Sequence, residues 1–455
     1  MSTFSGKIQE ISHISVDRFD ENNLTSEAYF LSHCHYDHMV GLHTHRFQNN
    51  LLENNKYLYA SEISCAILKL LYPSLKNNIK ILDIYTPTAL LLKGGNISVL
   101  PIPAGHCPGS VMFLFETNIR ILYTGDYRIN KNDIKKLKAF YDSYKQVKQI
   151  ETIYLDTTFF LKSYRKFPKR EESLEELCKI IKGWTDKGKH FSIKLFTSAK
   201  YGYEYMFNEI YKKTGMPVHV NREVFNFYST IPEMDKSVTL DCNATQIHCS
   251  CGISYQYVCD KALNSKIRTI KVSAFRWTQD NLEDGFSSNS SETYYVCYAT
   301  HASYEEGVEL LKFLKPKSVE ICVKHEDPLT NLEIAKLIEE VLDEFRSVAE
   351  VNVKHKLFET EENVSDESLT VVEEETIFNG FDIGILDSPP RNTWRSSTEL
   401  QMKAGSSLNN NSVRIHSIQI QSTESVNDII VQQSLDVVEL ESDINTEAPP
   451  NKKLK

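Results

Sequence analysis

The sequence predicts an α/β protein with two folded parts and a polar C-terminal tail, and three observations lead to this prediction. The chain has 455 residues and 41% of them are hydrophobic, which is enough for more than one core. Short runs rich in Val, Ile, Tyr and Phe alternate with helical patterns through two successive blocks. Past residue 352 the composition changes, and residues 357–388 contain ten acidic side chains and no Lys or Arg.

Strands predominate in the first block, which extends to about residue 155. A helix is expected over residues 61–71, and another where the chain continues from His38 with "HMVGLHTHRF". Each β-like run is bounded by turn residues. The expected strands cover residues 14–19, 28–33, 56–61, 97–104, 110–116 and 120–126.

The second block begins near residue 156 and has the strand–helix alternation of a small α/β layer. We expect helices over 170–184 and 201–215 and a strand over 191–196. Residues 293–348 then add two strands, each followed by a helix. The acidic and polar composition of the remainder, residues 352–455, predicts a mostly disordered tail.

Charge and apolar patterning limit the class of protein. The formal net charge is −10, but the acidic tail accounts for much of it, so nucleic-acid binding by the folded part is not excluded. The N-terminal "MSTFSGKIQE" has no apolar signal-peptide core, and no run of 18 apolar residues predicts a membrane helix, so no membrane partner is expected. The ten cysteines are therefore interpreted as reduced thiols or metal ligands.

The segment "SHCHYDH" has the composition of a metal site. His33 and His35 are two residues apart at an expected strand end, so both imidazoles can point the same way. Asp37 and His38 follow as the chain turns. Imidazole and carboxylate groups without thiolate suit catalytic zinc, and four such groups in one loop suit two adjacent metal ions. A histidine-rich surface turn is the simpler alternative.

Two further candidate ligands follow later expected strands. "PAGHCPGS" supplies His106 and "YTGD" supplies Asp126. A carboxylate at the second position could bridge two metal ions. An aspartate after glycine is also a common turn residue, so each position alone is ambiguous, but their joint occurrence in this order is specific.

These motifs resemble those of the metallo-β-lactamase fold. "DRF", with Asp17, resembles its first motif, and "YLDTTF", with Asp156, resembles the motif that opens an inserted β-CASP domain. Together with "YGYEYMF", they resemble the Artemis group of the DNA cross-link repair nucleases over about residues 1–325. The resemblance implies an αββα sandwich with an inserted β-CASP α/β domain and a disordered C-terminal tail. The implied boundaries are 1–155 and 300–351 for the sandwich, 156–299 for the insertion, and 352–455 for the tail.

The resemblance also implies the metal ligands. The first zinc ion would be held by His33, His35, His106 and Asp126. A second, weaker metal ion would be held by Asp37, His38 and the shared Asp126, with Mg²⁺ or Mn²⁺ as alternatives to zinc there. Asp37 and His38 therefore count among the catalytic residues, and Asp17 would support the ligands from behind.

A distant Asp–His pair is implied as well. Asp156 resembles the acidic residue of the family's motif A, and His301, in "YATHASYEEG", resembles the histidine of motif B. Such a pair suits phosphate contact or protonation of a leaving group. Val323 falls near motif C, where a valine is typical of the DNA-directed branch and a histidine of the RNA-directed branch; His325 lies only two residues on.

A separate structural zinc site is implied in the insertion. Its expected ligands are His219, His248, Cys251 and Cys259. Cys249 is the competing ligand, because the family pattern has its first cysteine where this chain has Ser250. Buried, inert thiols are the alternative.

Several segments are candidates for substrate contact. Residues 136–148 and 162–170 are basic with interleaved aromatic side chains, a composition that suits phosphate contact and base stacking but is also that of a solvated charged face. Lys200, Tyr201 and Tyr203 belong to the segment that resembles the Artemis group.

The implied function is that of a zinc-dependent DNA endonuclease. Hairpin opening and overhang trimming, with possible 5′-exonuclease activity, would serve non-homologous end joining and V(D)J-type recombination in the nucleus. The implied partners are DNA, the DNA-dependent protein kinase and the end-joining ligase complex, although this tail shows no visible match to the family's regulatory tail. The alternatives are a 5′-exonuclease of interstrand cross-link repair, an RNA-processing β-CASP endonuclease and a catalytically inactive scaffold.

Overall fold

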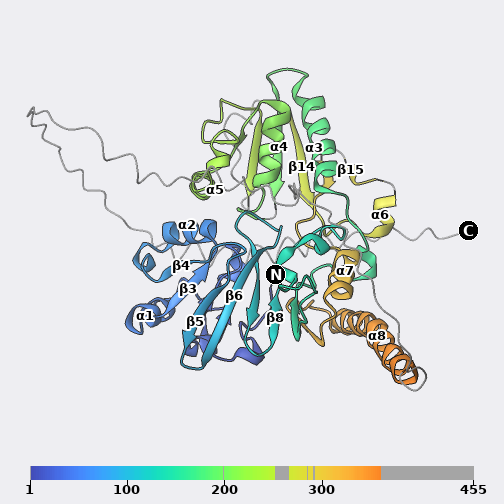
Figure 1. Cartoon of the computed structure of the whole chain (residues 1–455). Helices are drawn as coiled ribbons and strands as arrows, with labels where there is room; N and C mark the ends of the chain where they lie inside the picture. Colours follow the sequence, from blue (N-terminus) through green and yellow to red (C-terminus); the bar gives the residue numbers. More distant parts are fainter. Residues whose placement is uncertain (1, 198, 252–265, 284, 291–292, 360–455) are drawn as a thin grey trace, which may run out of the picture. The chain divides into compact units, whose positions relative to one another are not determined.

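The computed structural model describes residues 2–197, 199–251, 266–283, 285–290 and 293–359 (Figure 1). The tail from residue 360 onward, including most of the segment predicted to be disordered, lies outside this range. Among the helices in the described ranges, none is both long enough and apolar enough to cross a membrane.

A four-stranded parallel sheet contains the N-terminal part of the chain. Its strands, in order across the sheet, are β1 (Ile14–Val16), β2 (Ala28–Phe30), β3 (Tyr57–Ala60) and β4 (Ile79–Ile81). Along the chain, helix α1 (His45–Glu53) lies between β2 and β3, and helix α2 (Glu62–Leu71) lies between β3 and β4. Thr44 and Ser61 cap the two helices by accepting a hydrogen bond from a backbone N–H of the first turn.

A six-stranded mixed sheet forms the second layer of strands. Its order across the sheet is β17 (Ser318–Ile321), β9 (Thr152–Leu155), β8 (Arg120–Tyr123), β7 (Val111–Glu116), β6 (Gly95–Pro103) and β5 (Thr88–Leu92). The strands β5 to β8 form an antiparallel meander, whereas β9 and β17 are parallel to β8. Residues 318–321 therefore return to a sheet that residues 88–155 began.

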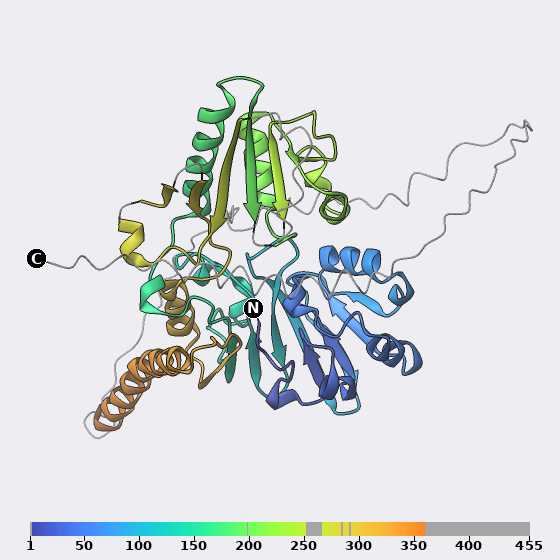
Figure 2. The same cartoon turned by 180° about the vertical axis from the view of Figure 1, so that it is seen from behind.

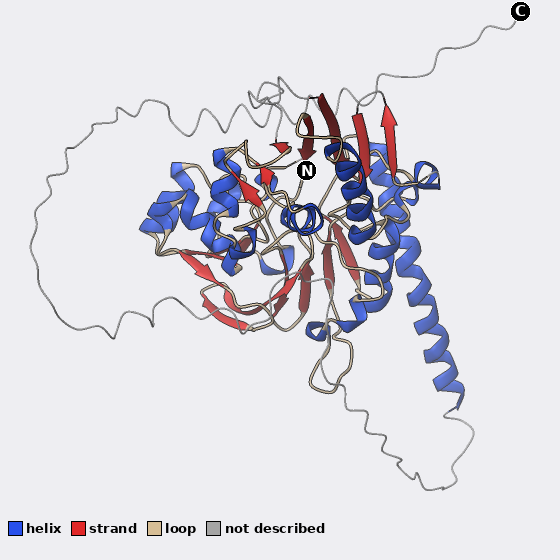
Figure 3. Cartoon of the chain, turned by 90° about the horizontal axis from the view of Figure 1, so that it is seen from above, coloured by secondary structure: helices blue, strands red, loops and turns tan. Residues whose placement is uncertain are grey.

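The two sheets pack face to face with helices on their outer sides. Phe30 of β2 lies 5.6 Å from Phe113 and 5.1 Å from Phe115 of β7, measured between ring centroids. The neighbouring side chain of Tyr29 points to the opposite face and contacts Phe47 of α1, as strand alternation requires. On the outer face of the second sheet, apolar side chains pack against α7 (Tyr304–Leu314) and α8 (Pro328–Glu359). These layers, with helices flanking the strands (Figure 3), confirm the predicted αββα sandwich of the metallo-β-lactamase fold.

A seven-stranded sheet occupies the segment predicted to be an insertion (Figure 2). Its order is β12 (Val238–Thr239), β11 (Val218–His219), β13 (Ile247–Cys251), β10 (Phe191–Thr197), β14 (Lys266–Ser273), β16 (Thr293–Cys297) and β15 (Ser287–Ser290). Only the pair of β15 and β16 is antiparallel. The helices of this segment are α3 (Arg170–Thr185), α4 (Glu204–Thr214), α5 (Arg222–Tyr228) and α6 (Gln279–Glu283). The boundaries 156–299 of the insertion stay a prediction.

Three local features differ from the sequence-based expectations. No helix begins at His38: a 3₁₀ turn covers Tyr36–His38, the chain bends at Gly41 with a φ of +94°, and α1 begins only at His45. A side chain at Gly41 would collide with the backbone of Phe19, so the bend requires glycine. The strands β4, β5, β9 and β11 to β15 were not predicted. The helix α8 continues to Glu359, inside the predicted tail.

Candidate metal centre

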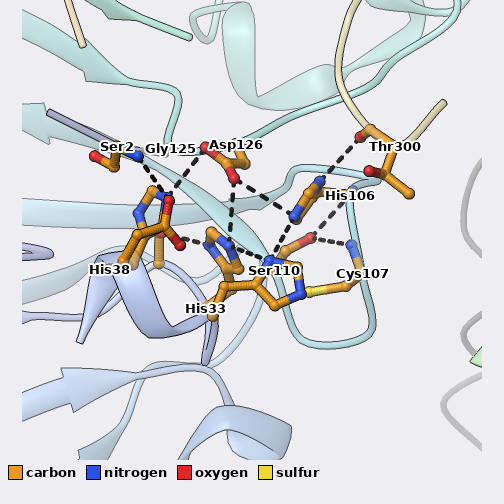
Figure 4. A network of polar contacts seen from close by, with 12 residues as sticks. Ser2, His33, His38, His106, Cys107, Ser110, Gly125, Asp126 and Thr300 are labelled. Carbon is orange, nitrogen blue, oxygen red and sulfur yellow. Dashed lines mark hydrogen bonds and ion pairs between the residues drawn. The ribbon is translucent and has the colours of Figure 1, made fainter. Parts of the chain in front are cut away.

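The predicted metal ligands follow the ends of three strands. His33 and His35 lie in the loop after β2, His106 lies in the loop between β6 and β7, and Asp126 follows β8. Figure 4 shows His33, His38 and His106 arranged around the carboxylate of Asp126. The six-stranded sheet and the four-stranded sheet thus each contribute side chains to one cluster.

The first group of donors converges on one point. His33 Nε2 lies 3.0 Å from His35 Nδ1, and His106 Nε2 lies 2.9 Å from the same His35 Nδ1. Asp126 Oδ2 is 3.5 Å from both His33 Nε2 and His106 Nε2. The four ligand atoms all lie within 4.8 Å of one another, as expected for a metal site.

The hydrogen bonds of the outward-facing ring nitrogens determine the tautomer of each imidazole, and therefore whether the inner nitrogen is protonated. His35 Nε2 lies 2.8 Å from the carbonyl oxygen of Tyr201, and His106 Nδ1 lies 3.0 Å from that of Thr300. A carbonyl oxygen can only accept, so each outer nitrogen carries the proton and donates it. In the neutral rings, two bare lone pairs then face each other 2.9 Å apart, an arrangement that favours a bound cation between them.

Burial keeps these rings in the form that binds metal. It lowers the pKa of His33 and His106 well below the ordinary value, and it also lowers the pKa of His35. The three imidazoles are therefore neutral near pH 7, as metal ligation requires. Burial raises the pKa of Asp126, but the adjacent histidines, His38 foremost, outweigh it and hold the pKa well below its usual range.

A second group of donors lies on the other side of the Asp126 carboxylate. Asp126 Oδ1 is 3.2 Å from His38 Nε2, and Asp37 Oδ2 is 3.8 Å from that same nitrogen. His38 Nε2 is buried and has no hydrogen-bond partner of good geometry among the described residues. The backbone N–H of Ser2 donates to Asp37 Oδ2 at 2.6 Å and holds this carboxylate in place. The structure therefore brings Asp37, His38 and Asp126 together as the sequence predicted.

Asp17 orients the ligands from behind. Its carboxylate accepts hydrogen bonds from Ser32 N at 2.7 Å, Ser32 Oγ at 2.5 Å, Tyr123 Oη at 2.8 Å and His38 Nδ1 at 2.8 Å. Although Asp17 also lies near His33, these four donors occupy both of its oxygens. Asp17 is thus placed to fix the tautomer of His38 rather than to bind metal itself.

Asp156 and His301 meet beside the first group of donors. His301 Nδ1 lies 2.9 Å from Asp156 Oδ2, and His301 Nε2 lies 3.8 Å from Asp126 Oδ2. Thr158 donates to Asp156 Oδ1 through both its backbone N–H and its hydroxyl. Burial disfavours the imidazolium, but the carboxylates of Asp126 and Asp156 outweigh it and raise the pKa of His301. The pair is therefore suited to proton transfer next to the metal site.

Val323 contacts the residue that follows Asp156. The carbonyl oxygen of Val323 accepts a hydrogen bond from Thr157 Oγ1 at 2.7 Å, directly beside Asp156. His325 is tied by its backbone N–H and C=O to the side chain of Asn331 at the start of α8. Its buried Nε2 has no partner among the described residues.

Comparisons with known proteins bear on this site. No family model matches the chain. The chain is 34% identical to protein artemis of Gallus gallus over 346 residues, which are 70% of this chain and 47% of that protein. It is 27% identical to the DNA cross-link repair 1A protein of Homo sapiens, covering 64% of this chain and 28% of that protein. It is also 27% identical to the 5′ exonuclease Apollo of Rattus norvegicus, covering 65% and 50%.

The chain belongs to the Artemis family of DNA cross-link repair proteins. It spans about half the length of the Artemis proteins that it matches. The metal-ligand residues belong to the same motifs, "SHCHYDH", "PAGHCPGS" and "YTGD", that carry the sequence resemblance to this family.

The structural zinc site implied by the Artemis family is only partly described. His219 and His248 are register partners on β11 and β13, with their Nδ1 atoms 3.2 Å apart. One N–H···N hydrogen bond explains this contact without a metal ion. Cys249 is buried on the other face of β13 and lies 3.7 Å from Thr197 Oγ1, so it is not placed to join the two histidines. Cys259 and the side chain of Cys251 lie outside the described residues.

The predicted substrate contacts of the Artemis-like "YGYEY" segment require correction. Tyr201 and Tyr203 are 5% and 7% exposed, so their rings pack inside the protein and do not offer a surface to substrate. The hydroxyl of Tyr201 donates to the carbonyl of Pro108, in the loop that contains His106. Lys200 is ion-paired with Glu223, with the charged atoms 2.8 Å apart, and its contact with substrate stays a prediction.

A buried glutamate holds this segment against the metal ligands. The side chain of Glu204 is 2% exposed, and its Oε1 accepts a hydrogen bond from Gly202 N at 3.1 Å. A Cβ atom at Gly202 would lie 3.0 Å from His35 Nε2, and Gly202 has a φ of +108°, so glycine is needed where the backbone passes the ligand. Sequence patterns gave no signal for Glu204, because a single acidic residue at a helix start is common on surfaces.

Replacing Glu204 with glutamine is expected to raise the free energy of unfolding above that of the parent chain, and this gain should be larger at pH 8 than at pH 5. Burial raises the pKa of Glu204 from 4.5 to about 7. Because the pKa is raised in the folded state, the contribution of Glu204 to the free energy of unfolding is fully present below pH 4.5. This contribution is lost as the pH rises through 7. Glutamine keeps the acceptor for Gly202 and cannot ionise, so the gain at pH 8 should approach roughly 3 kcal/mol.

The measurement is the free energy of unfolding by denaturant at both pH values. Glu209→Gln, on the same helix but paired with Lys212 at the surface, is the matched control. An equal gain from Glu204→Gln at pH 5 and pH 8 would show that ionisation of Glu204 is not its origin.

Proposed function

We propose that the chain is a zinc-dependent nuclease that hydrolyses phosphodiester bonds of DNA in repair. The observation that carries this proposal is the Asp156–His301 pair, whose outer ring nitrogen lies 3.8 Å from the carboxylate shared by the two groups of metal ligands. The relatives of the chain support it, because they include artemis proteins, a DNA cross-link repair protein and a 5′ exonuclease.

The donor set supports zinc as the cofactor. Three neutral imidazoles and one carboxylate form the first group, with no thiolate among them, and Asp37, His38 and Asp126 could hold a second ion. When bound, zinc lowers the pKa of water from about 15.7 to about 7 and offsets negative charge on the phosphate. Mg²⁺ or Mn²⁺ are alternatives at the second position, where two of the three ligands are carboxylates.

The chain's own residues would then direct proton transfer. Asp156 accepts the Nδ1 proton of His301, so His301 Nε2 faces the metal ligands and can give a proton to the departing oxygen of the cleaved strand. The two hydrogen bonds from Thr158 keep Asp156 from turning away. No side-chain nucleophile is needed for this reaction.

The choice of DNA over RNA is supported by Val323. A valine beside Asp156 is typical of the DNA-directed branch, and His325 is held in the turn before α8. We propose an endonuclease that opens hairpins and trims overhangs in end joining and V(D)J-type recombination, acting in the nucleus with the DNA-dependent protein kinase and the ligase complex. The similarity to the 5′ exonuclease Apollo favours a 5′-exonuclease of cross-link repair as the second candidate.

The test offers the full chain a sealed DNA hairpin, a 5′-phosphorylated single strand and an RNA of matching sequence, with and without a chelator. Hairpin opening that the chelator abolishes is the expected result. Asp37→Ala should remove the activity, because it takes away the carboxylate that faces His38 Nε2. Cleavage products are measured on denaturing gels.

The controls separate the candidates. Asp83→Ala, at an exposed position, should leave cleavage unchanged. Degradation of the single strand from its 5′ end without hairpin opening would support the exonuclease instead. Cleavage of RNA alone, or cleavage that the chelator does not affect, would contradict the proposal.

A further inference from the structure

A row of aromatic rings leads from the catalytic histidine to the protein surface. Phe159, three residues after Asp156, is buried, and its ring centroid lies 6.0 Å from that of His301. On its other side the Phe159 ring lies 4.8 Å from Phe275, which follows β14. Phe275 is 51% exposed and forms the outer end of this row. An exposed aromatic ring is ordinary by itself, but this one continues a packed row that begins at the active site.

The row is rigid, because its members are fixed on several sides. The Phe159 ring also contacts Tyr164 and Phe167, with centroid separations of 4.8 and 5.0 Å. The hydroxyl of Tyr164 donates to the carbonyl oxygen of Phe275 at 3.2 Å, which fixes the backbone that carries the exposed ring. Phe275 therefore presents a ring that is already held in place, so binding a ligand costs little side-chain entropy.

The surroundings of this ring favour an anionic ligand. The aromatic residues of the basic segment 162–170 pack inward around Phe159, whereas Lys162, Arg165 and Lys166 remain exposed. The first two pair with Glu340 and Glu305 at the surface, where such pairs are weak. Arg276, next to Phe275, lies over the ring of Tyr295 at 4.0 Å from its centroid. Cations beside an aromatic face are the combination that binds single-stranded nucleic acid.

We propose that Phe275 is a stacking site for one unpaired DNA base on the strand that is cut. This inference rests on the proposed function. The rings of Phe275 and His301 are no farther apart than the two centroid separations above combined, which is the length of about two or three stacked nucleotides. The base on Phe275 is therefore at most about three nucleotides from the scissile phosphate. A base paired within a duplex is already stacked on both faces, so the site selects substrates with single-stranded DNA beside the cut.

Phe275→Ala is expected to raise KM for a DNA hairpin or overhang by about 5- to 150-fold, because stacking of one base on an aromatic ring is lost. The value of kcat should change little, since Phe275 does not touch the reacting atoms. Phe275→Trp, which keeps an aromatic ring, should have a KM close to that of the parent chain. Leu91→Ala, which truncates an exposed apolar side chain on β5, is the matched control.

A second readout does not depend on catalysis. Substrates with a single abasic nucleotide at successive positions are bound to the full chain in the presence of a chelator, and affinity is measured by fluorescence anisotropy. In the parent chain one abasic position, within about three nucleotides of the cut, should weaken binding. In Phe275→Ala that same position should have no further effect.

The outcomes distinguish the two proposals. If the parent chain cleaves no DNA substrate, the proposed function fails whatever Phe275 does. If it cleaves DNA but Phe275→Ala has the KM of the parent chain, or the abasic effect persists in the variant, the stacking site is refuted while the nuclease stands. A higher affinity for single-stranded RNA than for DNA of the same sequence would also contradict the assignment of DNA as the ligand.

Discussion

Replacing Asp126 with alanine is expected to reduce cleavage by at least roughly 1,000-fold and to lower the metal content of the purified protein. The two oxygens of Asp126 face different histidines: Oδ2 lies 3.5 Å from His33 Nε2, and Oδ1 lies 3.2 Å from His38 Nε2. Alanine removes a ligand from both groups at once and leaves His38 and His301 without a carboxylate that favours their charged forms. Metal content is measured by atomic emission, and cleavage with the hairpin substrate.

The exposed Asp83→Ala is the matched control, and circular dichroism establishes that Asp126→Ala remains folded. Full metal content in a folded Asp126→Ala protein would contradict the ligand assignment. An intermediate result, with one of two ions retained, would assign the remaining ion to His33, His35 and His106.

The second large effect is expected at His301. Alanine there should lower kcat by about 100- to 10,000-fold, because the proton for the departing oxygen is no longer supplied. Metal content should stay close to that of the parent chain, since the first group of donors is complete without His301. The combination of normal metal content and lost turnover separates this role from metal ligation.

Asp156→Asn tests the same pair from the other side. Asparagine keeps the shape of the side chain, but its amide can donate to His301 Nδ1 and so favour the wrong tautomer, and kcat should fall while KM changes little. His190→Ala, at an exposed histidine, is the control for His301→Ala. A loss of bound metal in either site variant would argue that the pair is a third part of the metal site instead.

Much of the fold and of the metal site was predictable from the sequence, because both depend on local patterns. Runs rich in Val, Ile, Tyr and Phe marked the longer strands, such as 97–104 and 110–116, close to their observed bounds. His33, His35, His106 and Asp126 each follow such a strand, and strand ends gather at one edge of a sheet, so their meeting followed from their positions. The Asp156–His301 pair came from the family resemblance alone, since 145 residues separate its members.

The remainder could not be predicted because it depends on backbone path and burial. A helix from His38 was expected from apolar spacing, but the left-handed φ of Gly41 diverts the chain first. Tyr201 and Tyr203 were expected to contact substrate because they belong to the segment that resembles the Artemis group, yet both are buried. The exposed ring at Phe275 gave no signal, because a single phenylalanine at a strand end usually belongs to a core.

The carbonyl groups of Tyr201 and Thr300 have a consequence for how this protein can change over time. Each accepts the outer proton of a metal ligand, and each belongs to a stretch of chain far from the histidines that it orients. A main-chain oxygen is present whatever side chain the residue carries, so point substitutions at position 300 should be well tolerated. Insertions or deletions that shift the path of either stretch should not be, because they move the oxygen itself. The metal centre thus restricts the length of the connecting segments more than their composition.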